Sequence, residues 1–153
     1  MIRYKSLRLL LIILLSCYVS TVFSQDDSSL VKRFLLSNFS VFDNKKEIPL
    51  SFYKTFKKTT NARFLIANKD EMFNTTDVLV KGMPSRQLVF GGIDSTGKFG
   101  FIYYRTGGIV ITSHVLFFDT ELKKEAKFFS LVFSDQPDDQ EELKKSVMMN
   151  IRQ

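Results

Sequence analysis

His114 is the only histidine in the 153-residue chain, so any acid, base or metal site that needs an imidazole must use it. Ser113 precedes it but cannot act as its nucleophile within a regular strand, because consecutive side chains point to opposite faces. A serine partner, such as Ser95 or Ser130, would have to come from elsewhere in the fold, and the sequence selects neither. A small secreted hydrolase that uses His114 is therefore an alternative. The alternation favours a packed histidine, and its neighbours on that face would be Thr112, Leu116 and Phe118.

A glycine-containing segment from Gly92 to Lys98 has the spacing of a phosphate-binding loop. Phe99 follows it, at the position where such a loop needs the serine or threonine that binds magnesium. A phosphate loop must also open a helix, whereas the residues after Lys98 have the pattern of a strand. We therefore predict a hairpin turn with Gly97 at positive φ and no nucleotide binding.

Three pairs of adjacent carboxylates offer acid–base chemistry, and they are Asp70–Glu71, Asp138–Asp139 and Glu141–Glu142. Hydrolysis by two carboxyl groups requires that they face each other across a cleft, but these pairs fall in a loop or at the start of a helix. Acids in a first turn stabilise a helix N-terminus, so we predict that they serve helix ends. The sequence indicates no metal site and no cofactor.

Aromatic side chains are concentrated in one expected strand, where Phe99, Phe101 and Tyr103 share a face. A sheet that is apolar on both faces must be covered on both, or else it presents one face to a partner. Burial in the core is the more common outcome. Two tyrosines and an arginine near a double-glycine turn nevertheless resemble an interaction surface in composition. The binding residues that we predict are Phe101, Tyr103, Tyr104 and Arg105.

The first 24 residues are typical of an export signal. Basic residues come first, an apolar run from Leu9 to Leu15 follows, and small polar residues lead to a predicted cut between Ser24 and Gln25. An uncleaved anchor is the less favoured alternative, because a spanning helix needs about 20 mostly apolar residues. Residues 14–17 also resemble a bacterial lipobox, which would make Cys17 the site of lipidation and tether the protein to a membrane. The apolar residues after Cys17 favour the unlipidated form.

The composition of the expected mature chain, residues 25–153, narrows the function classes. Its net charge is +3, because 19 basic residues remain against 16 acids, and it lacks the basic stripe with exposed aromatics of a nucleic-acid binder. We therefore expect no nucleic-acid partner. The only cysteine lies in the leader, so the mature chain has no disulfide and must be stabilised by packing. A small exported chain without disulfides favours a bacterial envelope.

Periodicity predicts one α+β domain over residues 25–153. Helices are expected over residues 29–40 and 49–58 and again after Pro137, because apolar residues there recur at three- and four-residue steps or acids and proline mark a start. Short connections require antiparallel neighbours. The expected strands cover residues 63–67, 78–80, 88–90, 99–104, 109–118 and 126–133. We predict an antiparallel meander of about five strands packed against N-terminal and C-terminal helices.

These observations favour an exported, non-catalytic binding module that is secreted or periplasmic. Its expected partner is an envelope protein or an apolar ligand, and a membrane is involved only if Cys17 is lipidated. Besides the hydrolase, a second alternative is an inhibitor or immunity-type partner of a secreted enzyme.

Overall fold

The computed structural model describes residues 29–151 except 79, 121–126 and 134–135. The predicted leader, Cys17 and the predicted cut after Ser24 lie outside these residues. Within the part that is described, no helix has both the length and the apolar composition needed to cross a membrane.

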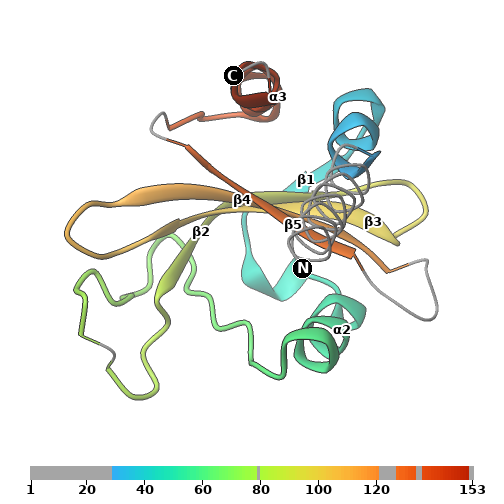
Figure 1. Cartoon of the computed structure of the whole chain (residues 1–153). Helices are drawn as coiled ribbons and strands as arrows, with labels where there is room; N and C mark the ends of the chain where they lie inside the picture. Colours follow the sequence, from blue (N-terminus) through green and yellow to red (C-terminus); the bar gives the residue numbers. More distant parts are fainter. Residues whose placement is uncertain (1–28, 79, 121–126, 134–135, 152–153) are drawn as a thin grey trace, which may run out of the picture.

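Five strands form one antiparallel sheet whose spatial order follows the chain, β1-β2-β3-β4-β5 (Figure 1). Their bounds are Ser40–Phe42, Arg86–Ile93, Phe99–Thr106, Thr112–Asp119 and Lys127–Phe133. The register is regular from β3 to β5, whereas β2 carries a bulge between Leu88 and Phe90. The predicted α+β fold with a five-stranded antiparallel meander is confirmed.

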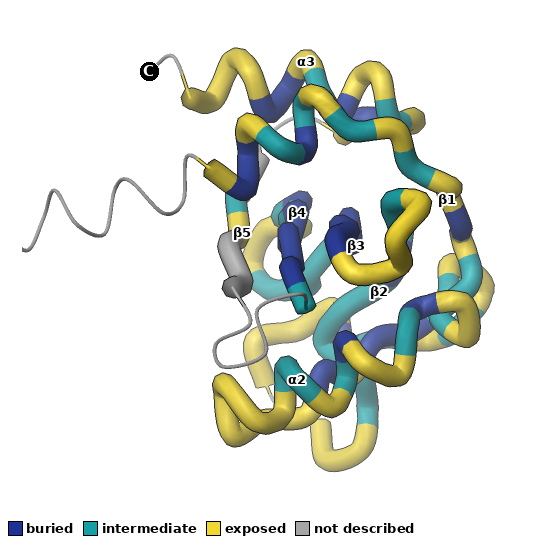
Figure 2. The backbone as a smooth tube through the Cα atoms, turned by 90° about the vertical axis from the view of Figure 1, so that its right-hand side faces the viewer, coloured by how far each residue is buried: buried dark blue, intermediate teal, exposed yellow. Residues whose placement is uncertain are grey.

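Helices cover both faces of this sheet (Figures 1 and 2). The helical residues 29–36 and α3 (Gln140–Ile151) lie on one face, and α2 (Leu50–Thr60) lies on the other. A short 3-10 helix, η1 (Lys45–Glu47), precedes α2, which starts directly after Pro49. The central strands β3 and β4 are buried on both faces, as a sheet that is apolar on both sides requires.

The first face is held together by phenylalanine rings. Phe34 from the first helix packs against Phe101 and Phe117 of the sheet, with ring centroids 5.1 and 4.8 Å apart. Leu143 and Val147 of α3 are fully buried in the same cluster. Each such side chain stabilises the fold by about 1.5–3 kcal/mol relative to an exposed one, so these two helices are anchored mainly by burial.

The second face is organised around Phe52 of α2. Its ring lies 5.0 Å from Phe64 and 4.9 Å from Phe118. Ile66 is buried in the same cluster. Phe64, Ile66 and Ala67 of the connection from α2 to β2 therefore contribute to the core.

The helix predicted over residues 29–40 is too long, because its described helical residues end at 36 and β1 follows. Two adjacent glycines in β2 explain why β1 docks there. A Cβ at Gly91 would lie 2.5 Å from Phe42 Cζ, and one at Gly92 would lie 2.9 Å from Phe39 Cβ. Glycine at these positions leaves room for the Phe42 ring at Gly91 and for Phe39 Cβ at Gly92, and this long-range fit outweighs local helix periodicity.

The strand predicted over residues 63–67 is present only as a single bridge between Ala67 and Gln87. Its alternating pattern reflects burial of Phe64 and Ile66 in the second core face rather than pairing in the sheet. The edge strand predicted over residues 78–80 is also absent at Val78 and Val80, and residue 79 lies outside the described part.

The apolar residues 109–111 were expected to belong to the same strand as Val115. They instead connect β3 to β4, which begins at Thr112. Ile109 is 91% exposed. Gly108, at φ 149°, turns the chain before these residues, so they project from the hairpin and have no strand opposite them.

Candidate ligand-binding site

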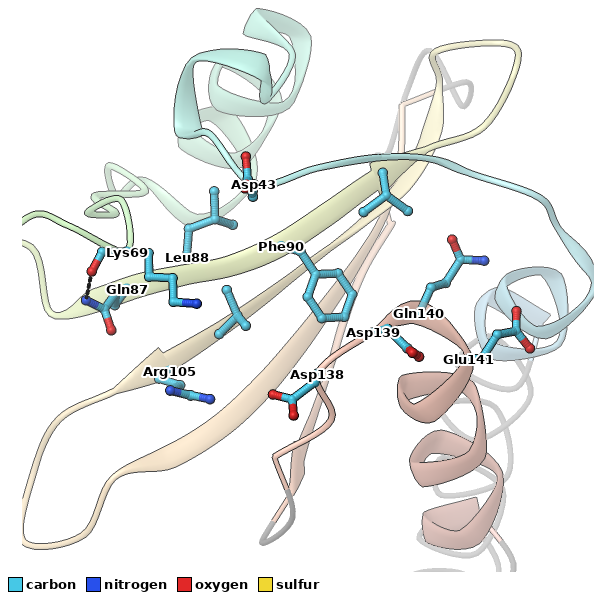
Figure 3. Close-up of a pocket in the computed structure, with 12 residues that line it drawn as sticks. Asp43, Lys69, Gln87, Leu88, Phe90, Arg105, Asp138, Asp139, Gln140 and Glu141 are labelled. Carbon is cyan, nitrogen blue, oxygen red and sulfur yellow. Dashed lines mark hydrogen bonds between the residues drawn. The ribbon is translucent and has the colours of Figure 1, made fainter.

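A hollow of about 570 Å³ opens at the outer edge of β2, beside the start of α3 (Figure 3). We call it the β2 hollow, and its wall is formed by Val41, Asp43, Lys69, residues 87–90, Arg105 and residues 138–141. Its apolar part comes from Val41, Val89 and the buried side chains of Leu88 and Phe90. The volume is within the range of ordinary small-ligand sites. Serine, threonine, cysteine and histidine do not occur among these lining residues.

Arg105 is the more buried of the two cations that line the hollow. It lies half-buried on β3, in register with Gln87 of β2 and Ser113 of β4. Its Nε is buried and has no hydrogen-bond partner in the described part of the chain. Leaving a buried donor without a partner costs about 1–3 kcal/mol. A hydrogen-bond acceptor on a ligand would therefore remove this energetic cost at Arg105 Nε.

Lys69 supplies a second cation on the same side of the hollow. The Gln87 side-chain amide donates to the Lys69 carbonyl at 3.0 Å, which fastens this loop to β2 (Figure 3). The Lys69 side chain is exposed, and no ion pair involving it occurs among the residues described. Because the Lys69 backbone is held to β2 while its ammonium group is not engaged in an ion pair with any described residue, Lys69 places positive charge at this end of the hollow.

Carboxylates from the start of α3 form the opposite side. Asp139 Oδ1 accepts the Glu142 amide at 2.9 Å, and Glu142 Oε2 accepts the Asp138 amide at 3.0 Å. These reciprocal bonds cap the helix, which confirms the predicted helix-end role for Asp139 and Glu142. Glu141 lies 3.8 Å from Lys144. The Asp138 carboxylate, in contrast, has no hydrogen bond or ion pair within the described ranges.

The loop pair Asp70–Glu71 has a different role from a catalytic dyad. Glu71 accepts hydrogen bonds from the Lys45 ammonium and from the Asn68 amide. The Lys45 ammonium and the Asn68 amide hold the pKa of Glu71 below its usual value, against a smaller opposing effect of desolvation. Glu71 ties the loop to Lys45 of η1, so a structural role accounts for Glu71.

Of the four predicted binding residues, only Arg105 lines the hollow. Phe101 and Tyr103 are fully buried in the first core face, and Tyr104 is buried in the second. Their alternation along β3 sends them into the two helix-covered layers. In this structure these three side chains serve packing, and their contact with a partner stays a prediction.

His114 lies half-buried on β4, away from the β2 hollow. Its Nε2 is hydrogen-bonded to the hydroxyls of Thr106 and Thr112 at 3.0 and 2.8 Å. The ring stacks on Tyr104 at 5.2 Å with an interplanar angle of 8°. Burial, and then the positive charge of Arg86, lower the pKa of His114. Within the described residues, the hydrogen-bond partners of His114 Nε2 are these two threonine hydroxyls. A hydrolase that uses His114 stays a prediction.

The segment that resembled a phosphate loop is the hairpin turn between β2 and β3, as predicted. The Gly97 amide donates to the Asp94 carbonyl at 3.0 Å, and Gly97 has φ 69°. Burial raises the pKa of Asp94, but hydrogen bonds from Thr96 and from the amides of Phe99 and Lys98 outweigh it and leave that pKa below its usual value. The carboxylate therefore organises the turn.

Sequence reasoning missed most of the hollow. Asp43 and Lys69 fall in connections, where charged residues are ordinary, and the sequence indicated Asp138, Asp139 and Glu141 only as acids at the start of a helix. The one usable signal was Arg105, a charged residue at the end of an otherwise apolar aromatic run. A charge at that position indicates a polar environment at the end of a buried strand.

Comparison of the chain with models of known protein families, with curated proteins and with solved structures finds no match. The geometry of the β2 hollow is therefore the basis for the functional proposal. In the described part of the chain, no group of three histidine, cysteine or carboxylate side chains is placed to hold a metal ion.

Proposed function

We propose that this chain is an exported, non-catalytic binding module, secreted or periplasmic, that holds its ligand in the β2 hollow. The ligand is a small molecule with an apolar part, or a group of that kind presented by an envelope protein. The observation that carries the proposal is the half-buried Arg105, whose buried Nε lacks a partner in the described residues. Local rules of protein stability are most often broken at functional positions.

The surroundings of Arg105 support a role in binding. Leu88 and Phe90 supply buried apolar surface, and Lys69 adds a second cation without an ion pair in the part described. Binding sites commonly combine an apolar lining with a few polar groups that orient the ligand. A guanidinium held in such a setting binds a carboxylate through two parallel hydrogen bonds.

Filling the hollow tests this proposal. Val41 lines it and is 53% exposed, so V41W places an indole at its rim while the core stays intact. Val80 is 48% exposed and does not line the hollow, which makes V80W a matched control. The mature proteins, labelled with ¹⁵N, are titrated with fractionated small molecules from the envelope, and amide shifts are recorded.

We expect shifts at the amides of Gln87, Arg105 and Asp138 in the wild type and in V80W, but not in V41W. Equal responses from wild type and V41W, or no fraction that shifts these amides, would overturn the proposal. A parallel pull-down from the envelope fraction distinguishes a protein partner from a small ligand, since small-ligand binding survives in purified protein.

Export is tested by the mass of the protein recovered from its host. A chain that begins at Gln25 is the expected result. A lipidated N-terminal Cys17 would make the module membrane-tethered, and recovery inside the cell with Met1 attached would refute export.

A further inference from the structure

The two cations that line the β2 hollow, Lys69 and Arg105, come from the loop beside β2 and from β3, whereas Asp138, Asp139 and Glu141 line it at the start of α3 and Asp43 follows β1. Figure 3 shows Lys69 and Arg105 on the side of β2 and β3 and Asp138 just before α3, and Phe90 of β2 lines the same hollow. Arg105 and Asp138 are not within ion-pair distance of each other. The hollow therefore holds a cation and an anion that do not neutralise one another.

We propose that the ligand is a short peptide with both ends free, a dipeptide or tripeptide with apolar side chains. This inference rests on the proposed function and names its ligand class. The peptide carboxylate binds the Arg105 guanidinium, its ammonium group binds Asp138, and an apolar side chain lies against Phe90. A ligand with two opposite charges and an apolar middle is the one that satisfies all three features.

The electrostatics of α3 support this orientation. A helix N-terminus alone attracts anions, but three carboxylates already occupy the start of α3: Asp139, Glu141 and Glu142. These negative charges outweigh the partial positive charge of the helix end, which is roughly half an elementary charge. That side of the hollow consequently favours an ammonium group.

The same charges disfavour two other ligand classes. A phosphate or another multiply charged anion would be repelled by Asp43 and Asp138, although Arg105 would attract it. A purely apolar ligand would leave the Arg105 Nε without a partner and would desolvate Asp138, which is costly for a carboxylate. A peptide with free ends avoids both penalties.

Trileucine is the probe, and its N-acetylated and C-amidated forms each lack one terminal charge. Binding to the mature protein is measured by calorimetry and by amide shifts at the hollow. We expect amidation to weaken binding by roughly 10- to 100-fold, the equivalent of one lost charge-assisted interaction. R105M should bind the free peptide as weakly as the wild type binds the amidated one, and amidation should cause no further loss in R105M.

Several variants make the result specific. R105K keeps the charge without the guanidinium fork and should show an intermediate loss, and R63M, at an exposed arginine outside the hollow, should bind as the wild type does. D138N should be insensitive to N-acetylation, whereas D77N, an exposed control, should remain sensitive.

Equal binding of the free and the doubly capped peptide, with shifts at the hollow, would overturn the peptide inference and leave the proposed binding site standing. Shifts from neither peptides nor envelope fractions would overturn both.

Discussion

Replacing Arg105 by methionine should make the protein more stable while it abolishes the proposed carboxylate contact. The substitution removes a buried Nε–H that has no partner in the described structure and keeps an unbranched apolar stem of similar length. An unsatisfied buried donor costs about 1–3 kcal/mol. Because Arg105 is only half-buried, the lower end applies, and we expect the free energy of unfolding to rise by about 1 kcal/mol.

Urea denaturation followed by circular dichroism measures this change. The midpoint should rise with an unaltered m value, and the melting temperature should rise by about 4 °C for a chain of this size. R63M serves as the control and should leave both quantities unchanged, because Arg63 is exposed. A loss of 1 kcal/mol or more in R105M would show that the guanidinium stabilises the fold, and the main argument for a ligand at the β2 hollow would then be lost.

Three further predictions concern the stability of the fold outside the hollow. R33M should lower the free energy of unfolding by about 2 kcal/mol, because Arg33 Nη1 lies 2.6 Å from Oδ2 of Asp119, whose side chain is only 9% exposed. This value is below that of a fully buried ion pair because the Arg33 side chain is partly exposed. A double-mutant cycle with D119N that gave no coupling energy would refute this prediction. His114 has a pKa below its usual value of 6.5, so it contributes stability above about pH 6.5 that is lost as the pH falls through its folded pKa. The stability difference between wild type and H114Q in urea should therefore shrink between pH 7.5 and 5.5, and a difference that grew would contradict this sign. G107A should destabilise by about 2 kcal/mol in the same assay, because its Cβ would lie 2.2 Å from the backbone of residues 74–75, and an unchanged midpoint would refute the tight packing of these loops.

The fold class followed from local patterns that tertiary structure did not override. Alternating apolar residues, short connections and the turn at Gly97 require antiparallel hairpins, because chain geometry allows no parallel crossover in so few residues. The start of α2 was also predictable from a local signal, because Pro49 directly precedes it. The end of the first helix was not local, since β1 packs where Gly91 and Gly92 of a distant strand leave room for the Phe42 ring and for Phe39 Cβ.

The candidate site depended on tertiary structure almost entirely. Asp43, Lys69, Arg105 and Asp138 are separated along the chain by 26, 36 and 33 residues, and no periodicity connects them. They meet because the edge of β2, a loop bridged to it and the start of α3 converge there. The sequence by itself determined which segments pair and which faces are apolar, since those properties depend on neighbouring residues. Only the folded structure decided which charged groups face a common hollow and which of them lack a partner, because burial and distance are properties of the packed chain.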